Sequence, residues 1–346
     1  MPTDFLAPSP ADPTRPRYHA PIPLLPLDRG GVLRHARLAF HVDGEPSRTR
    51  DNVVLVLHAL TGSADAAGDW WREQIGPGRA IDTTRWAVVS PNLLGSCYGS
   101  SGPHVPGCEL FPALTVRDQA RALRILLDQL NVQRLALVTG GSLGGMVALE
   151  LAASFPGLVE QAAVFAAPAT LGAGAIGWSH VQRRALDLGG EHGLALAREI
   201  AMLTYRTSRG LDARFARRSG DTAAYAVQDW LATHGQRLSA RLPAVTYRAL
   251  LEVMDSHDLA HGRVGIGERL RASGTRFTGI GIPGDIFCAP EDVRSWVDAA
   301  GGEYRELQSP HGHDAFLLEH EQVSAVLAEV LASTPQSPAS RAQEVA

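Results

Sequence analysis

The sequence has few cysteines, no long hydrophobic run and no excess of positive charge. Its three cysteines (Cys97, Cys108 and Cys288) are too few and too scattered for a disulfide framework, and none has the spacing of a metal site. We therefore expect free thiols in a reducing cytoplasm, and no metal. The apolar runs fall well short of the roughly 18 residues of a membrane-spanning helix, which argues against a membrane protein.

The charge balance excludes further classes of protein. The net charge is −4 and the pI is near 6.3, so we expect no polybasic surface for nucleic acid or anionic membranes. Residues 1–26 contain eight prolines and no apolar core, unlike a signal peptide. We expect residues 1–30 to form an extended N-terminal arm and residues 333–346, rich in Ser, Pro, Ala and charge, to form a flexible tail.

The remaining sequence alternates between strand-like and helix-like runs. Short apolar runs predict strands at residues 32–42, 53–57, 86–90, 135–139, 161–166, 275–281 and 303–307. Between residues 171 and 262 these runs give way to Arg-, Ala- and Leu-rich helical segments. The pattern predicts an α/β domain with a mostly parallel central sheet flanked by helices, built from residues 31–170 and 263–332, with residues 171–262 as a helical lid insertion.

The segment Gly140-Gly141-Ser142-Leu143-Gly144 lies between a predicted strand and a run of helix-forming residues. A G-x-S-x-G between strand and helix is typical of a nucleophile elbow, in which the serine occupies a strained turn at a helix N-terminus. Glycines on both sides leave room for neighbouring backbone. Ser142 is therefore the predicted nucleophile.

A serine hydroxyl needs a base within hydrogen-bond reach and a carboxylate to orient that base. In the α/β-hydrolase fold the carboxylate and then the histidine follow the serine, each after a late strand. Asp285 and His313 obey this order; His311 is the alternative base, and we favour His313, partly because a family resemblance supports it. For the oxyanion hole we predict the backbone N–H groups of Leu143, which follows the nucleophile, and Leu60, which follows an early strand.

Over residues 31–332 the sequence resembles the homoserine O-acetyltransferase family, acyltransferases of the α/β-hydrolase fold. The resemblance rests on many short motifs that occur in the family's order. They are residues 58–62 (HALTG), 70–71 (WW), 75–78 (IGPG), 91–95 (PNLLG), 97–99 (CYG), 115–118 (TVRD), 140–146 (GGSLGGM), 203–206 (LTYR) and 312–317 (GHDAFL).

The resemblance implies a ping-pong reaction in methionine biosynthesis. Acetyl-CoA, a co-substrate rather than a permanently bound cofactor, would acylate Ser142, and the hydroxyl of L-homoserine would then accept the acetyl group. The family's homoserine contacts correspond to Arg198, Tyr205 and Asp314, which suits an amino acid because a guanidinium binds its carboxylate and an acid its ammonium. The family commonly dimerises through the lid, so we expect a cytoplasmic homodimer.

The sequence departs from the family pattern in two places, and we consider three alternative functions. Residues 184–193 replace a longer family loop, and the neighbourhood of Asp285 is looser than usual. O-succinyl transfer to homoserine or serine is the first alternative; a succinyl carboxylate would favour a nearby Arg or Lys, whereas the loop after Asn92 offers the neutral Tyr98. The second alternative is a serine esterase of the same fold, and the third is a binding protein without activity.

Overall fold

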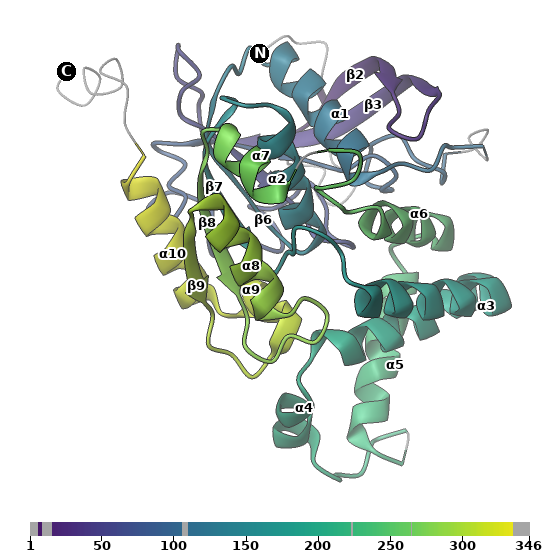
Figure 1. Cartoon of the computed structure of the whole chain (residues 1–346). Coiled ribbons are helices and arrows are strands. Elements are labelled where there is room, and N and C mark those ends of the chain that lie inside the picture. Colours follow the sequence, from purple (N-terminus) through teal and green to yellow (C-terminus); the bar gives the residue numbers. More distant parts are fainter. Residues whose placement is uncertain (1–5, 9–15, 106–109, 223, 264, 335–346) are drawn as a thin grey trace.

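The computed structural model describes residues 6–8, 16–105, 110–222, 224–263 and 265–334, so Cys108 and residues 335–346 of the expected tail lie outside the described residues. Within the described ranges a nine-stranded sheet runs through the molecule in the order β1-β2-β3-β5-β4-β6-β7-β8-β9 (Figure 1). The strands are β1 (Leu6–Pro8), β2 (Pro16–Pro26), β3 (Val32–Asp43), β4 (Val53–Leu57), β5 (Ala87–Pro91), β6 (Leu135–Gly141), β7 (Val159–Phe165), β8 (Arg276–Gly281) and β9 (Glu303–Glu306).

Strands β4 to β9 are parallel to one another, whereas β1, β2 and β3 lie along one side of the sheet and β3 pairs antiparallel with both β2 and β5. All residues of β4, β5 and β6 are buried, as in a parallel sheet covered on both faces. Because parallel strands end at the same edge, the loops after β4, β6, β8 and β9 meet there. The sequence therefore brings its predicted catalytic segments to one edge.

Part of the expected N-terminal arm belongs to the sheet. Residues 16–26 form β2, which pairs with β3 from Tyr18 to Pro26. Ile22 and Leu25 of this strand are fully buried. Its prolines concealed the strand pattern, and they are tolerated near a sheet edge, where fewer backbone N–H groups are needed.

Helices cover both faces of the sheet. They are α1 (Val116–Gln129), α2 (Leu143–Ser154), α7 (Ile266–Ala272), α8 (Pro290–Ala300), the short α9 (Ala315–Leu318) and α10 (His320–Ala332). Helices α1, α2 and α8 contribute to one hydrophobic cluster, and α10 packs with Trp71 in a second. Helix α1 begins at the predicted capping box, where the Thr115 side chain accepts from Asp118 N–H and the Asp118 carboxylate accepts in return.

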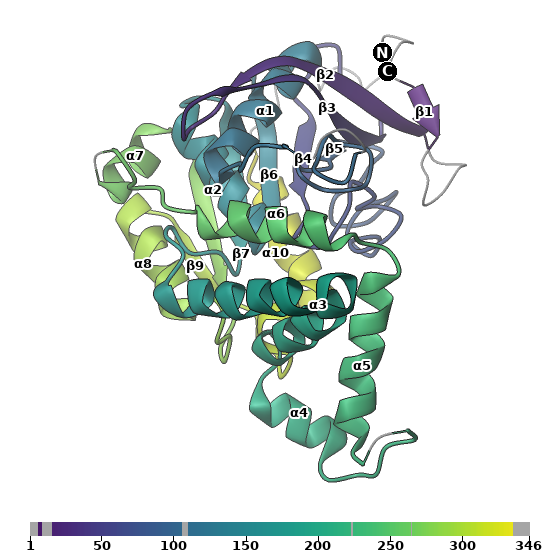
Figure 2. The ribbon, with the colours of Figure 1, turned by 90° about the vertical axis from the view of Figure 1, so that its right-hand side faces the viewer.

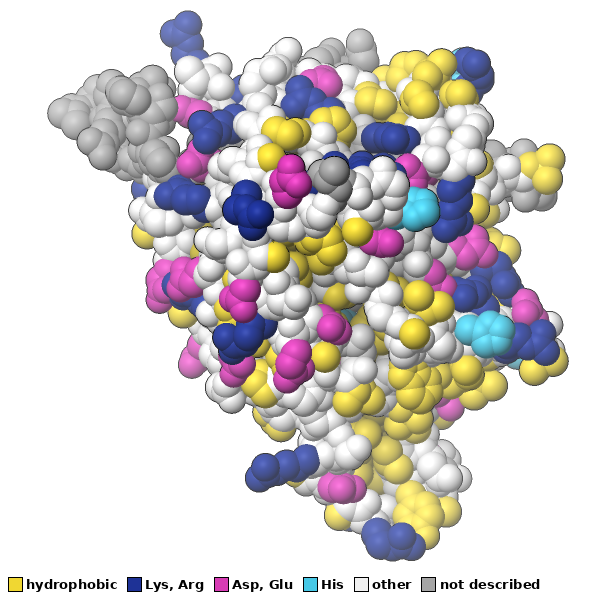
Figure 3. Space-filling view, viewed as in Figure 1, with side chains coloured by type: hydrophobic (Ala, Val, Ile, Leu, Met, Phe, Trp, Pro, Cys, Tyr) yellow, Lys and Arg dark blue, Asp and Glu magenta, His cyan; other side chains and the backbone are white. Residues whose placement is uncertain are grey.

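Four helices between β7 and β8 project beyond the strand ends (Figure 2). They are α3 (Ala173–Tyr205), α4 (Ser208–Phe215), α5 (Ala226–Ser239) and α6 (Ala244–Asp255), and we call this set the lid. Residues 184–193 are part of α3, which breaks at Gly190 with φ 53° and ψ −126°. Hydrophobic side chains gather on the lid surface (Figure 3).

Candidate active site

Ser142 lies in the turn between β6 and α2, with φ 55° and ψ −124°. A non-glycine residue in this region is strained, so the surrounding packing must hold it. The adjacent strand end explains why glycines are needed: a Cβ on Gly140 or Gly144 would lie 2.5 or 2.2 Å from the carbonyl oxygen of Leu57. The elbow is therefore pressed against the end of β4, and Ser142 is held at the edge where the loops meet.

His313 and Asp285 form a buried pair. His313 Nδ1 and Asp285 Oδ2 are 2.6 Å apart, and the other carboxylate oxygen accepts hydrogen bonds from the backbone N–H groups of Phe287 and Cys288 at 2.8 and 2.9 Å. Both carboxylate oxygens are thus occupied, which fixes the imidazole with Nδ1 protonated and Nε2 open. The hydrogen bond to Asp285 comes from His313, not from His311.

The environment of His313 raises its pKa. Burial alone would lower it, but the charge of Asp285, the hydrogen bond to Asp285 and the charge of Asp314 together outweigh burial. His313 Nε2 is buried and has no hydrogen-bond partner among the described residues, so no hydrogen bond joins it to Ser142. Such bonds are often long before substrate binds.

Phe316 connects this histidine to the elbow. Its ring lies 6.0 Å from the His313 ring, centroid to centroid, and a Cβ on Gly141, the residue before Ser142, would lie 2.4 Å from the same phenyl group. The Phe316 ring therefore packs against the residue before the serine and lies near the His313 ring.

The two predicted oxyanion donors come from different segments, the elbow and the loop after β4. Leu143 is the first residue of α2, where backbone N–H groups lack helical partners. Leu60 lies in residues 58–62, which we call the oxyanion loop; its turn is closed by a 2.9 Å hydrogen bond from Gly62 N–H to Ala59 O. The loop leaves β4 at the point where Gly144 of the elbow packs.

His58 holds the oxyanion loop, and its role was missed at the sequence level. Its Nε2 accepts from Leu93 N–H at 3.0 Å, so Nδ1 carries the proton and donates to Ala59 O at 2.8 Å. Burial lowers the pKa of His58 to about 4, which keeps it neutral. Its position at the end of a buried strand was the available signal.

Arg198 and Tyr205 lie on α3 and approach the His313–Asp285 pair. The guanidinium carbon of Arg198 is 5.7 Å from the centre of the Tyr205 ring, and that ring is 5.3 Å from the His313 ring. Burial raises the pKa of Tyr205 to about 12, so its hydroxyl stays protonated. Asp314 follows His313 and forms an ion pair with Arg206, Oδ2 to Nη2, at 3.0 Å.

Sequence reasoning missed Arg206 as the partner of Asp314. Its other terminal nitrogen, Nη1, is buried without a hydrogen-bond partner in the described residues. The signal was its place beside Tyr205 in the LTYR motif. The Asp314 carboxylate is therefore charge-balanced before any ammonium group arrives.

A cavity of about 650 Å³ opens beside these residues. Its lining comes from the core loops and from the lid. The residues are Ala59, Thr61, Gly62, Ser63, Asp69, Trp70, Tyr98, Arg198, Arg241 and Leu317. Two guanidinium groups and one carboxylate thus line a space next to the oxyanion loop, which suits a zwitterionic or acidic ligand.

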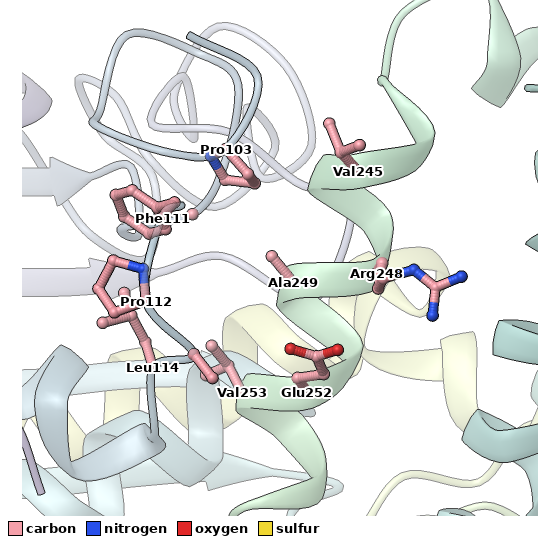
Figure 4. A pocket seen from close by; sticks show the side chains of 11 residues that line it. Pro103, Phe111, Pro112, Leu114, Val245, Arg248, Ala249, Glu252 and Val253 are labelled. Carbon is pink, nitrogen blue, oxygen red and sulfur yellow. The ribbon is translucent and has the colours of Figure 1, made fainter. Parts of the chain in front are cut away.

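A smaller cavity of about 210 Å³ lies between α6 and the loop before α1 (Figure 4). Phe111, Pro112 and Leu114 face α6 across it, while Arg248 extends away and pairs with Asp187. Neither cavity is lined by the predicted catalytic residues, but the larger one contains Arg198 and residues on both sides of Leu60, so we assign the chemistry to the larger one.

In the part of the chain that the structure describes, no three His, Cys, Asp or Glu side chains cluster as a metal site would require. Over the same residues, no helix combines the length and apolar character needed to cross a membrane.

Comparisons with known proteins agree with this architecture. A family model described as the alpha/beta hydrolase fold matches residues 52–244. A homoserine O-acetyltransferase of Thermus thermophilus is 43% identical over 338 residues, which cover 86% of each chain. Among solved structures, a homoserine O-acetyltransferase from Staphylococcus aureus has a TM-score of 0.81 at 27% identity, covering 95% of this chain and 99% of its own. An esterase, E22, has a TM-score of 0.83 at 18% identity, covering 91% and 99%, a likeness of fold alone.

Proposed function

The chain belongs to the homoserine O-acetyltransferase family, and from that premise we propose that it transfers an acetyl group from acetyl-CoA to the hydroxyl of L-homoserine. The catalytic residues in this proposal are Ser142, His313 and Asp285. The observation that supports this most directly is the buried His313–Asp285 pair, whose Nε2 has no hydrogen-bond partner among the described residues.

In the first half-reaction, His313 Nε2 takes the proton from Ser142 Oγ, and Oγ attacks the thioester carbonyl of acetyl-CoA. The negative oxygen of the tetrahedral intermediate accepts hydrogen bonds from the N–H groups of Leu60 and Leu143. The C–S bond then breaks, and His313 gives its proton to the departing CoA sulfur. Acetyl-CoA is thus a co-substrate, and the proposal includes no permanently bound cofactor.

In the second half-reaction, His313 takes the proton of the homoserine hydroxyl, whose oxygen attacks the acetyl-serine. The intermediate collapses to O-acetylhomoserine, and the proton returns to Ser142 Oγ. Arg198 binds the homoserine carboxylate and Asp314 its ammonium, while the protonated Tyr205 hydroxyl serves as a donor. We place this reaction in methionine biosynthesis in the cytoplasm.

Mass spectrometry of the covalent intermediate tests the proposal. Wild-type protein mixed with acetyl-CoA, without homoserine, should gain the mass of one acetyl group on the peptide that contains Ser142. Ser142→Ala should gain none, and its transfer rate should fall by a factor of about 10⁴ or more. Full turnover by the Ser142→Ala protein would exclude this mechanism.

O-succinyl transfer is the second candidate, and Arg241 is the observation that favours it. The loop after Asn92 supplies only the neutral Tyr98, but Arg241 reaches that tyrosine from the lid, with Nη1 2.5 Å from the hydroxyl oxygen. A succinyl carboxylate could use such a group. Steady-state rates with acetyl-CoA and succinyl-CoA distinguish the two, and a strong preference for succinyl-CoA would overturn the acetyl assignment.

A serine esterase differs from an acyltransferase in the molecule that attacks the acyl-serine. An esterase admits water, whereas a transferase excludes water and holds an amino-acid acceptor. Arg198, Tyr205 and Asp314 near His313 support an acceptor site. Product analysis in the presence of homoserine separates the two, because an esterase would release acetate instead of O-acetylhomoserine.

The lid supports a homodimer as part of the proposal. Its exposed large hydrophobic residues include Ile176, Trp178, Val181, Leu188, Leu196, Leu203 and Val245 (Figure 3). Leu188 and Leu196 expose 81% and 52% of their surfaces, and exposed apolar clusters mark association sites. Light scattering should give a dimer mass for the wild type and a monomer for Leu188→Glu with Leu196→Glu. Leu24→Glu, on β2, is the matched control and should remain dimeric.

A further inference from the structure

Arg241 forms hydrogen bonds that join the lid to two loops of the core. It lies between α5 and α6, and its Nη1 donates to Thr61 O at 2.8 Å and to the Tyr98 hydroxyl at 2.5 Å. Its own carbonyl oxygen lies 3.4 Å from the Tyr98 hydroxyl and 3.8 Å from Cys97 Sγ, each of which donates to it. Side chain and backbone of one lid residue therefore contact the loop after β4 and the loop after β5.

Thr61 is the residue after Leu60, the second oxyanion donor. The oxyanion loop is held at one end by His58, which donates to Ala59 O. At its other end the carbonyl of Thr61 accepts from Arg241. The Leu60 N–H belongs to the same peptide unit as the Ala59 carbonyl, which His58 holds, and the Thr61 carbonyl two peptide units further on is held by the lid.

We propose that Arg241 is a positioning residue for acyl transfer, which orients the Leu60 N–H by holding the carbonyl of Thr61. Both half-reactions pass through an oxyanion at that N–H, so Arg241 acts on both. The geometry of the oxyanion hole then depends on the α5–α6 junction of the lid. The inference rests on the acyl transfer proposed above.

The contacts of Arg241 favour this role over recognition of a donor carboxylate. Nη1 is already engaged by two oxygen atoms, one of them on the oxyanion loop. Burial raises the pKa of Tyr98 more than the charge of Arg241 lowers it, so the phenol stays protonated. It can therefore donate to Arg241 O while it accepts from Nη1.

Hydrolysis of p-nitrophenyl acetate and acetyl transfer to homoserine, measured side by side, test the proposal. Arg241→Ala should lower kcat in both assays by about tenfold, less than the loss of an oxyanion donor itself. The KM for homoserine should change less than twofold, because Arg241 does not hold the acceptor. Arg241→Lys should recover part of kcat, since an ammonium can still donate to Thr61 O, and Tyr98→Phe should cause a smaller loss.

Arg237→Ala is the matched control, an exposed arginine in the last turn of α5, and it should behave as the wild type. Unchanged kcat in Arg241→Ala would overturn the positioning role, as would a loss seen with succinyl-CoA and not with acetyl-CoA. If Arg241→Ala does not fold, equal kcat in Arg241→Lys, Tyr98→Phe and wild type would overturn it too. Failure of the wild type to form any acyl-enzyme would instead remove the proposed function.

Discussion

The hydrogen bond between His313 and Asp285 fixes the position of one proton on the imidazole. Asp285 has one oxygen on His313 Nδ1 and the other on two backbone N–H groups, so it cannot turn away from the imidazole. The raised pKa of His313 is a consequence of that carboxylate. Both the tautomer of the base and its proton affinity therefore depend on Asp285.

Replacing the carboxylate should change the rate and the pH profile. Asp285→Asn should lower kcat/KM by about 10⁴, because the amide favours the wrong imidazole tautomer. Activity needs neutral His313, so it rises with pH through the pKa of this residue. Since Asp285 raises that pKa, its loss should move the acid limb of the kcat/KM profile to lower pH.

Asp292→Asn removes the same charge from an exposed position on α8 and should leave rate and profile unchanged. If the acid limb of the kcat/KM profile does not move in Asp285→Asn, a group other than His313 controls that limb.

The acceptor site predicts a different kinetic signature. Arg198→Ala should raise the KM for homoserine by about 30-fold, the effect of losing a hydrogen bond to a charged group. It should spare the hydrolysis of p-nitrophenyl acetate, which needs no acceptor. Arg184→Ala, on the same helix but paired with Asp187 at its surface, is the control for loss of a lid charge. Unchanged homoserine kinetics in Arg198→Ala would remove this residue from the acceptor site.

Among the elements, β6 and α2 matter most because the turn between them has almost no free space. The glycine at the second position of α2 lies against the last residue of β4. This contact fixes the distance between the elbow and the oxyanion loop, which leaves the same strand. Packing between two elements thus sets the width of the predicted oxyanion hole.

Adding one methyl group at that contact should disturb the site. Gly144→Ala would place a Cβ 2.2 Å from Leu57 O, so α2 must shift, and we expect a loss of about 2 kcal/mol in the free energy of unfolding. Acetyl transfer should fall with it. Gly177→Ala, in exposed α3 with nothing near its Cβ, should instead stabilise by about 0.5–1 kcal/mol. Chemical denaturation measures both, and equal stability of the two variants would contradict the packing argument.

Over the whole molecule, buried neutral histidines link stability to pH. Burial lowers the pKa values of His58 and His257, both inside the fold. The unfolded chain binds protons on these groups near pH 6.5, whereas the folded state does not. The free energy of unfolding therefore falls as pH drops below the unfolded value toward the folded one.

For His58 the folded pKa of about 4 predicts a loss of about 2 kcal/mol between pH 7 and pH 5. His58→Gln removes the titrating group, so its stability should decline less steeply over the same range. Urea denaturation at several pH values measures the slope. If the free energy of unfolding of His58→Gln falls with pH as steeply as that of the wild type, a group other than His58 causes the pH dependence.

Local patterns in the sequence were enough to predict much of this protein. Residues 53–57 form the predicted strand, Thr115 caps the predicted helix, and Ser142 lies between strand and helix. These features depend on neighbours within a few residues, so hydrophobic periodicity, capping chemistry and glycine spacing reveal them. The chain order of Ser142, Asp285 and His313 predicted a triad, because each follows a strand of one parallel sheet, and the structure shows the His313–Asp285 hydrogen bond of that prediction.

Only the tertiary structure decided which groups meet across the site. It pairs Asp314 with Arg206, brings Arg241 to Thr61 across 180 residues of sequence, and makes residues 16–26 a strand of the sheet. Such contacts join segments that lie far apart in the sequence, and the local pattern of one segment does not identify its partner. Their partners are set by how helices and loops pack at the strand ends, which no local pattern encodes.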